Sequence, residues 1–318
     1  MYKDGIFVFD NVTSANLSEL TLKHSVICER RICEISDLAN EIVFAMSDMI
    51  DDGYGMYEML SIISEGSFPW SSDVNISSLP QNSKRIENSI KLLSSQDKAI
   101  LSDLVTDKLK EKGYDINERD FLPEESGDER ITYVKNVLSD EAFDVFSQEL
   151  SEPRVMYSSS FSDAVRAVSS GTCEYCLLPL EERGGARLAA VAELLFKEDL
   201  RINSVTPVFG PEGAVDMKYA LVSKHFTVPE INDGDDRYLE LRIRGDNAIE
   251  ISELLAAADT LNIKPYRINT ISFETEDGYS PYYSIVFKDD GKDFSPFLFF
   301  LTLFAGDYTT VGIYKNLE

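Results

Sequence analysis

Residues 131–224 decide the fold: ITYVKNVLSDEAFDVFSQELSEPRVMYSSSFSDAVRAVSSGTCEYCLLPLEERGGARLAAVAELLFKEDLRINSVTPVFGPEGAVDMKYALVSK. Short runs rich in β-branched residues alternate there with amphipathic segments. The pattern predicts strands at 131–134, 154–157 and 174–180, and helices at 139–150 and 161–169. Strand and helix repeated in this order favour a parallel sheet covered by helices, an α/β arrangement. Further on, PEGA at 211–214 predicts a hairpin turn between two strands.

Residues 236–318 predict a second unit. The expected strands are RYLELRIRG (237–245), KPYRINTISFE (264–274), YYSIVFK (282–288) and TTVGIYK (309–315). Helices are expected at 248–263 and 293–304, and TEDGYSP (275–281) is expected to form a turn. The resulting βαββαβ order is typical of a ferredoxin-like α+β fold.

Residues 1–127 predict a mostly helical segment of no recognised family. Apolar residues from Ile100 to Leu109 follow Ser94 at helical spacing, and Gly113 ends the run. A weaker helical pattern surrounds Ile42, and strand-like runs occur at 5–9 and 18–32. The acidic, turn-rich stretch DFLPEESGDER predicts a linker. The expected domains are therefore 1–127, 128–230 and 236–318.

The 318-residue chain carries a formal net charge of −26 and is 43% hydrophobic. The apolar content supports folded cores and argues against general disorder. An acidic surface repels nucleic-acid phosphates and anionic lipids, so we expect neither nucleic acid nor a membrane as partner. The first ten residues lack a signal-peptide pattern, and the longest apolar run, PFLFFLTLFAG (296–306), is too short to span a bilayer. These features favour a cytoplasmic protein.

Few residues suggest metal or thiol chemistry. Cys173 and Cys176 have the CxxC spacing, but side chains three positions apart on a strand point to opposite faces. A zinc or redox role is the alternative to buried free thiols, which we favour. The two histidines, His24 and His225, are far apart in the sequence. We therefore expect no metal site and no cofactor.

The order and wording of the elements in 131–224 resemble prephenate dehydratase, whose catalytic domain has a type-two periplasmic-binding-protein fold. The resemblance implies removal of a hydroxyl and a carboxyl group from prephenate, which leaves phenylpyruvate. The family's Thr-Arg-Phe motif aligns with Met217, Lys218 and Tyr219. Its Pro-Ile-Glu-Asn-Ser turn aligns with PLEER, in which Glu181 matches the glutamate.

A serine run at 158–160 precedes Phe161. Ser160 either lines a pocket or caps the following helix, and capping is the interpretation that we favour. If the chain is an active dehydratase, the resemblance implies Lys218, Glu181 and Ser160 as its catalytic residues.

The sequence departs from the dehydratase pattern at three places. Methionine at 217 cannot donate a proton to a leaving hydroxyl, and lysine at 218 lacks the planar, two-pronged grip of arginine. The loop VKNVLSDEAF (134–143) has no glycine where the family has a glycine-rich turn. Where the family has a second lobe, this chain has only PEGA, which leaves half of the domain and one wall of a cleft.

Following this core, residues 236–318 resemble an ACT domain, a regulatory module that binds small molecules. The resemblance implies an amino acid or a shikimate-pathway acid as ligand, and a homodimer formed through this domain. The family's phenylalanine-binding motifs fall on 249–251 and 269–272, where they are not retained. Position alone makes Asp246 and Asn247, in the loop 244–247, and Asn269 candidates for ligand binding. The alternative for this loop, which we favour, is a connection between strand and helix in which Asp246 or Asn247 caps the helix.

Two hypotheses follow. The first is a dehydratase-like protein without dehydratase activity that acts by binding a small molecule in aromatic amino-acid metabolism. The alternative is an active prephenate dehydratase, with an N-terminal segment similar to the chorismate mutase that some bacteria fuse to this enzyme. Lys23, Arg30 and Arg31 are the cations that such a mutase site would use, although their spacing does not reproduce its motif.

Overall fold

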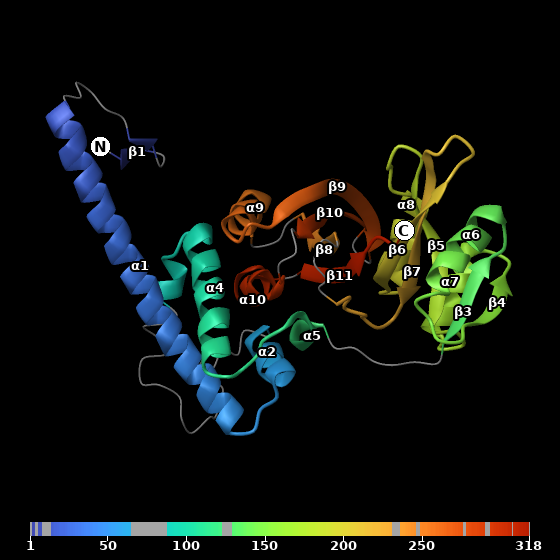
Figure 1. Ribbon diagram of the computed structural model, residues 1–318, viewed down its shortest axis with the longest axis horizontal. Coiled ribbons are helices and arrows are strands. Elements are labelled where there is room, and N and C mark those ends of the chain that lie inside the picture. The colour runs from blue at the N-terminus through green and yellow to red at the C-terminus, as the bar shows by residue number, and fades with distance from the viewer. Residues whose placement is uncertain are drawn as a thin grey trace.

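The computed structural model describes residues 2–3, 6–7, 14–64, 88–122, 129–230, 236–245, 249–275, 278–289, 293–306 and 308–317, without the side chains of 2–28, 61–64 and 274–275. In this part of the chain, three groups of elements follow one another along the long axis of the molecule (Figure 1). A helical segment comes first, then a four-stranded sheet with two helices, and then a five-stranded sheet with three helices. No helix within these ranges combines the length and the apolarity that a membrane span requires.

The N-terminal segment is mostly helical, as its sequence predicts. Its helices are α1 (Ser14–Asp51), α2 (Met56–Ser64), α4 (Ser95–Glu111) and α5 (Glu118–Phe121), and two-residue strands β1 (Tyr2–Lys3) and β2 (Ile6–Phe7) precede them. Ser94 caps α4 in a capping box with Asp97, and Gly113 follows the helix with a φ of +90°.

The strand-like run predicted at 18–32 is wrong, because these residues belong to α1. The second half of α1 is anchored by buried residues such as Ile35, Ile42 and Met46. Once this part is helical, each added residue gains a hydrogen bond at little cost, so the helix extends through the β-branched residues before it. Of the strand predicted at 5–9, Ile6 and Phe7 form β2, and the other three positions lie outside the described residues.

The five-stranded sheet is mixed. Its strands are β3 (Arg130–Val134), β4 (Arg154–Ser158), β5 (Tyr175–Glu182), β6 (Arg201–Phe209) and β7 (Val215–Ser223), in the order β4-β3-β5-β7-β6. Strands β4, β3 and β5 are parallel, as predicted, whereas β7 runs antiparallel to β5 and β6. The predicted hairpin turn at 211–214 reverses the chain between β6 and β7, so the sheet is mixed at this end.

Three helices accompany this sheet: α6 (Val137–Phe146), α7 (Phe161–Ser169) and α8 (Ala189–Lys197). The capping box that starts α6 joins Asn136 and Ser139, so this helix begins before the predicted position. Helix α7 has the predicted bounds.

The four-stranded sheet has the βαββαβ order of a ferredoxin-like unit. Its elements are β8 (Arg237–Arg244), α9 (Ile251–Thr260), β9 (Lys264–Thr275), β10 (Gly278–Asp289), α10 (Ser295–Phe304) and β11 (Tyr308–Lys315), with strand order β11-β8-β10-β9. The turn predicted at 275–281 is too long, since β9 and β10 remain paired up to Thr275 and Gly278.

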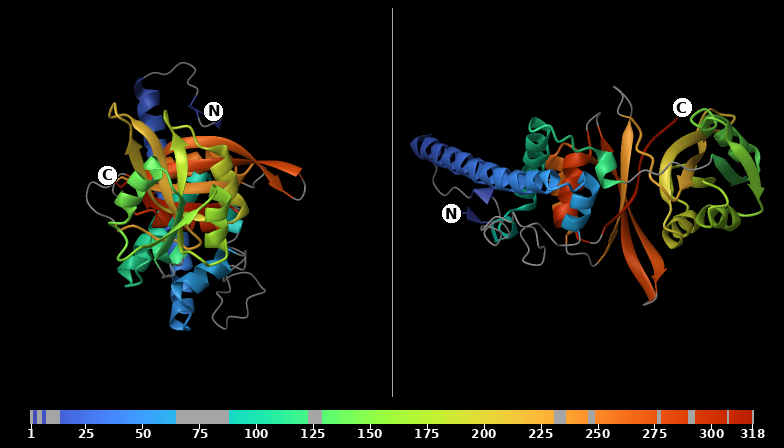
Figure 2. Two further views of the ribbon diagram at one scale, coloured as in Figure 1. Left: turned by 90° about the vertical axis from the view of Figure 1, so that its right-hand side faces the viewer. Right: turned by 90° about the horizontal axis from the view of Figure 1, so that it is seen from below.

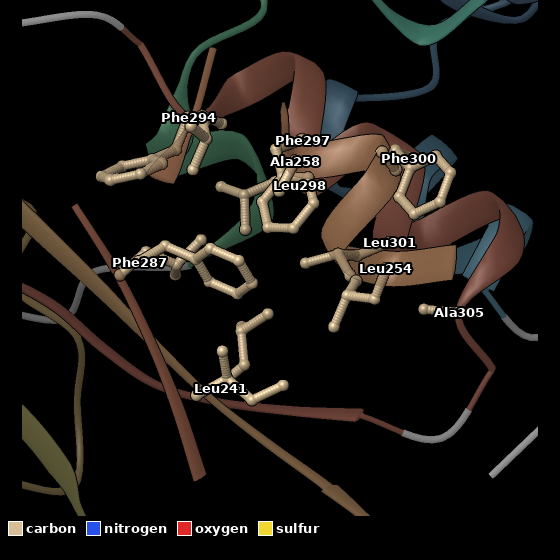
Figure 3. Close-up of a cluster of buried hydrophobic side chains, with 14 of the residues drawn as sticks. Leu241, Leu254, Ala258, Phe287, Phe294, Phe297, Leu298, Phe300, Leu301 and Ala305 are labelled. Carbon is tan, nitrogen blue, oxygen red and sulfur yellow. The ribbon is translucent and has the colours of Figure 1, made fainter. Parts of the chain in front are cut away.

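The core of this unit lies between its sheet and its two helices, where Leu241 and Phe287 face Leu254, Phe297 and other apolar side chains (Figure 3). On another side of α10, Phe299 joins the apolar cluster of α1, α2 and α4. Apolar side chains thus cover α10 all round because helices and a sheet both pack on it.

The other face of the four-stranded sheet packs against the five-stranded sheet, so the ferredoxin-like unit lies in the middle of the molecule (Figure 2). In β8, Leu239, Leu241 and Ile243 point to the ferredoxin-like core. Glu240 and Arg242 alternate with them and therefore point to the opposite, covered face. Strand β11 continues past this face, and Leu317 N donates to Val205 O of β6 at 2.7 Å.

Candidate functional site

Two of the candidate catalytic residues lie side by side. Glu181 at the end of β5 and Lys218 on β7 are cross-strand partners, and Lys218 Nζ lies 3.8 Å from Glu181 Oε2. A register shift after Pro179 precedes this pair. The Glu181 side chain is 8% exposed and that of Lys218 is 22% exposed, so the lysine stands at the rim.

Arginines on both sides of the interface contact the same carboxylate. Arg267 of β9 donates to Glu181 with both terminal nitrogens, and its Nη2–Oε2 distance is 3.3 Å. Arg187, in the loop after β5, places Nη1 3.5 Å from Glu181 Oε1. The Nη2 of Arg187 also donates to Glu240 of β8, so one arginine joins the carboxylates of the two sheets.

We name Glu181, Arg187, Lys218, Glu240 and Arg267 the interface charge cluster. The Glu240 carboxylate also accepts from Ser284 Oγ and Tyr314 OH, each at 3.1 Å. Burial, followed by the Glu240 charge, raises the pKa of Tyr314, so its phenol stays a neutral donor. Three cations face two carboxylates, and the cluster therefore carries an excess positive charge inside a strongly acidic protein.

Little free space remains in this cluster. The cavity there has a volume of about 10 Å³, and its described lining residues are Leu180, Glu181, Val205, Lys218, Tyr238, Tyr266, Arg267, Val286, Tyr314 and Asn316. A volume of roughly 10–15 Å³ holds one water molecule, whereas small-molecule sites usually enclose about 300 Å³ or more. The arrangement binds the two units together and has no room for a substrate.

The other candidate residues are dispersed. Ser160 is the N-cap of α7, where its Oγ accepts from Asp163 N at 3.1 Å, so the favoured capping role is confirmed. Asn269 is half-buried on β9, opposite Ser284 of β10. Asp246 and Asn247 lie outside the described residues.

The described residues include no group of three or more histidine, cysteine, aspartate or glutamate side chains that could hold a metal ion. Cys173 and Cys176 are buried free thiols. Burial raises the pKa of both thiols, which disfavours the reactive thiolate.

Sequence reasoning did not find Arg187, Glu240 or Arg267. A signal exists for Glu240, which stands inside an apolar strand, but the alternation of Leu239, Glu240 and Leu241 also fits a strand with one solvent-facing side. Arg267 gives no such signal, because Glu181 lies 86 positions away. Arg187 is close to Glu181 in the sequence, but its other partner, Glu240, is 53 positions away.

Neither a family model nor a curated protein matches this chain. Among solved structures, prephenate dehydratase from Streptococcus mutans is 13% identical, with 60% of this chain and 100% of that chain covered and a TM-score of 0.49. The dehydratase of Arthrobacter aurescens in complex with L-Phe is also 13% identical, covering 58% and 89%, with a TM-score of 0.43. A protein described as a novel type of quorum-quenching acylase is 17% identical, covering 59% and 96%, with a TM-score of 0.44.

Proposed function

We propose that this protein is a dehydratase-like protein without dehydratase activity, which acts by binding a small anionic molecule in aromatic amino-acid metabolism. One observation carries the proposal. The position that the resemblance assigns to catalysis is filled by the interface charge cluster, whose cavity has a volume of about 10 Å³.

The chemistry of dehydration supports the same conclusion. Expelling a hydroxyl and a carboxyl group requires cations that hold the substrate's carboxylates and a donor for the leaving hydroxyl. Lys218 and Arg267 instead pair with Glu181, and Met217 has no proton to donate. A substrate carboxylate would have to displace Glu181 from its cationic partners and leave that carboxylate buried and unpaired.

We further propose that residues 1–127, 128–230 and 236–318 form three domains, the last of which is an ACT-like regulatory domain. Two chains pair through this domain in the cytoplasm. Its ligand is an amino acid or a shikimate-pathway acid. Three apolar clusters support this division, since one lies mainly in the N-terminal helices, one mainly in the ferredoxin-like unit and one mainly among the strands and helices of 131–221. A fourth cluster joins the two sheets.

A thermal-shift screen tests the binding role. The purified chain is heated with each of the proteinogenic amino acids, and with shikimate, chorismate, prephenate and phenylpyruvate, at constant ionic strength. At least one acid is expected to raise the midpoint in a concentration-dependent manner, because a ligand that binds only the folded state stabilises it by mass action. An intact fold that none of these compounds stabilises would rule out the proposed role.

A further inference from the structure

Arg242 is a buried cation whose close contacts among the described residues are with aromatic rings. It lies on β8, on the face covered by the five-stranded sheet, and is 8% exposed. Within the part of the chain that the structure describes, its guanidinium makes no hydrogen bond and no close ion pair. Burial lowers the pKa of Arg242; the charge of Glu240 is the next largest influence and raises it, and the charge of Arg201 lowers it. A largely buried guanidinium without a hydrogen bond or ion pair can bind an anion.

Aromatic rings flank this cation. The guanidinium carbon lies 5.0 Å from the ring centre of Phe196 and 5.3 Å from that of Phe273. The two phenyl rings stack on each other at 4.1 Å, and Tyr282 packs edge-on against both. Phe196 is half-buried in the last turn of α8, so one side of the aromatic group is open to solvent.

Arg242 also belongs to a row of polar residues. On three adjacent strands it is the cross-strand partner of Ser284, which in turn faces Asn269. Side chains at paired positions lie on the same face of a sheet, so all three face the five-stranded sheet. Ser284 donates to Glu240, whereas the half-buried Asn269 amide makes no hydrogen bond among the described residues. The row thus offers a free guanidinium and a free amide beside an aromatic group.

A role in packing alone does not account for an arginine here. A methionine would contact both phenyl rings with a side chain of similar length and without the cost of burying a charge. The cation–π contacts offset only part of that cost. The protein as a whole has a net charge of −26, so anions are repelled from its surface in general and a buried free cation is a selective place to hold one.

We propose that Arg242 binds the carboxylate of a small aromatic acid, whose ring packs against Phe196, Phe273 and Tyr282. The site rests on the proposed function, because it gives the ligand-binding role a location and a ligand class. A planar guanidinium holds a carboxylate through two parallel hydrogen bonds, which a neutral ligand cannot form as strongly. Asn269 is placed to bind a further polar group of the ligand.

Isothermal titration calorimetry with phenylacetate tests this site. Phenylacetamide has the same ring without the charge and serves as the ligand control. Arg244→Met serves as the protein control, because it removes an exposed arginine two positions further along the same strand. We expect phenylacetate to bind the wild-type chain and the Arg244→Met variant alike. Phenylacetamide and the Arg242→Met variant should each lower the affinity at least about tenfold, and Arg242→Lys should fall between.

Equal binding of phenylacetate to the Arg242→Met variant and the wild type would overturn the site, as would no binding to the wild type. Circular dichroism confirms that each variant is folded, and Arg242→Lys decides the question if Arg242→Met does not fold. Failure of phenylacetate while another acid stabilises the chain in the thermal screen removes this site and leaves the proposed function standing. Turnover of prephenate removes the proposed function whatever the result at Arg242.

Discussion

Glu118, Arg237 and Asp289 form a second buried ionic group, which fastens α5 to the ferredoxin-like unit. All three residues are at most 4% exposed. Glu118 accepts from Arg237 Nη2 and from Phe294 N, and Asp289 lies 3.8 Å from Arg237 Nη1. Two carboxylates share one guanidinium, and Asp293 nearby adds to the negative charge. Burial, opposed by Arg237, raises the pKa of Glu118 to about 7.

This group predicts a pH dependence of stability. Because the pKa of Glu118 in the folded chain is above its unfolded value, the folded state holds the extra proton, and this stabilisation is complete below about pH 4.5. It is lost as the pH rises through about 7. The free energy of unfolding falls by roughly 3 kcal/mol over this pH range. Urea denaturation of Glu118→Gln should show a flatter pH profile over this window than the wild type, whereas Glu141→Gln, an exposed control, should keep the slope. Equal slopes for all three proteins would contradict the assignment.

The individual elements are the part of the fold that the sequence predicts best. Caps such as Ser94 and Ser160, the hairpin at 211–214 and the apolar helix α10 all depend on short-range patterns, and the structure contains each of them. Errors occur where distant contacts decide. The strand-like run at 18–32 becomes helical through the buried half of α1.

Gly312 lies where the backbones of β11 and β6 approach each other closely. It lies in β11 beside a register shift, and a Cβ at this position would overlap the carbonyl oxygen of Ile202 in β6. The backbones therefore approach each other in a way that only glycine permits. We expect Gly312→Ala to lower the free energy of unfolding by about 2 kcal/mol, since the clash is with backbone and cannot relax by a side-chain rotation.

Gly55→Ala is the matched control, because nothing lies within 4 Å of a Cβ there. Its effect should stay within about 0.5 kcal/mol. Guanidinium denaturation measures both variants, and a neutral Gly312→Ala would show that β6 and β11 do not pack in the described way.

On the scale of the whole molecule, the interface charge cluster joins the two sheets, and this is the level that the sequence did not predict. Lys218 and Glu181 were found through a motif, but Arg267 is separated from Glu181 by 86 positions. Glu240 alternates with apolar residues as a solvent-facing residue would, and only the packing of one sheet on the other buries it. Local patterns carry no information on such a contact.

Arg187 is the residue whose loss should weaken this joint most. Arg187→Met leaves Glu240 buried with two neutral donors and no cation bonded to it, and we expect the free energy of unfolding to fall by about 3 kcal/mol. Adding Glu240→Gln removes the unpaired charge, so the double variant should be more stable than the Arg187→Met variant. Urea denaturation of the four proteins of this double-mutant cycle measures the coupling. Strictly additive effects would mean that the two side chains do not form a pair in solution.

The central claim, that the position assigned to catalysis is closed to substrate, is tested most directly by a single-turnover assay. The protein is mixed in molar excess with prephenate at neutral pH, and phenylpyruvate is followed by its absorbance against a buffer blank. The account predicts the same slow rate with and without protein. Phenylpyruvate formation that increases with protein concentration and disappears in the Lys218→Met variant would contradict it.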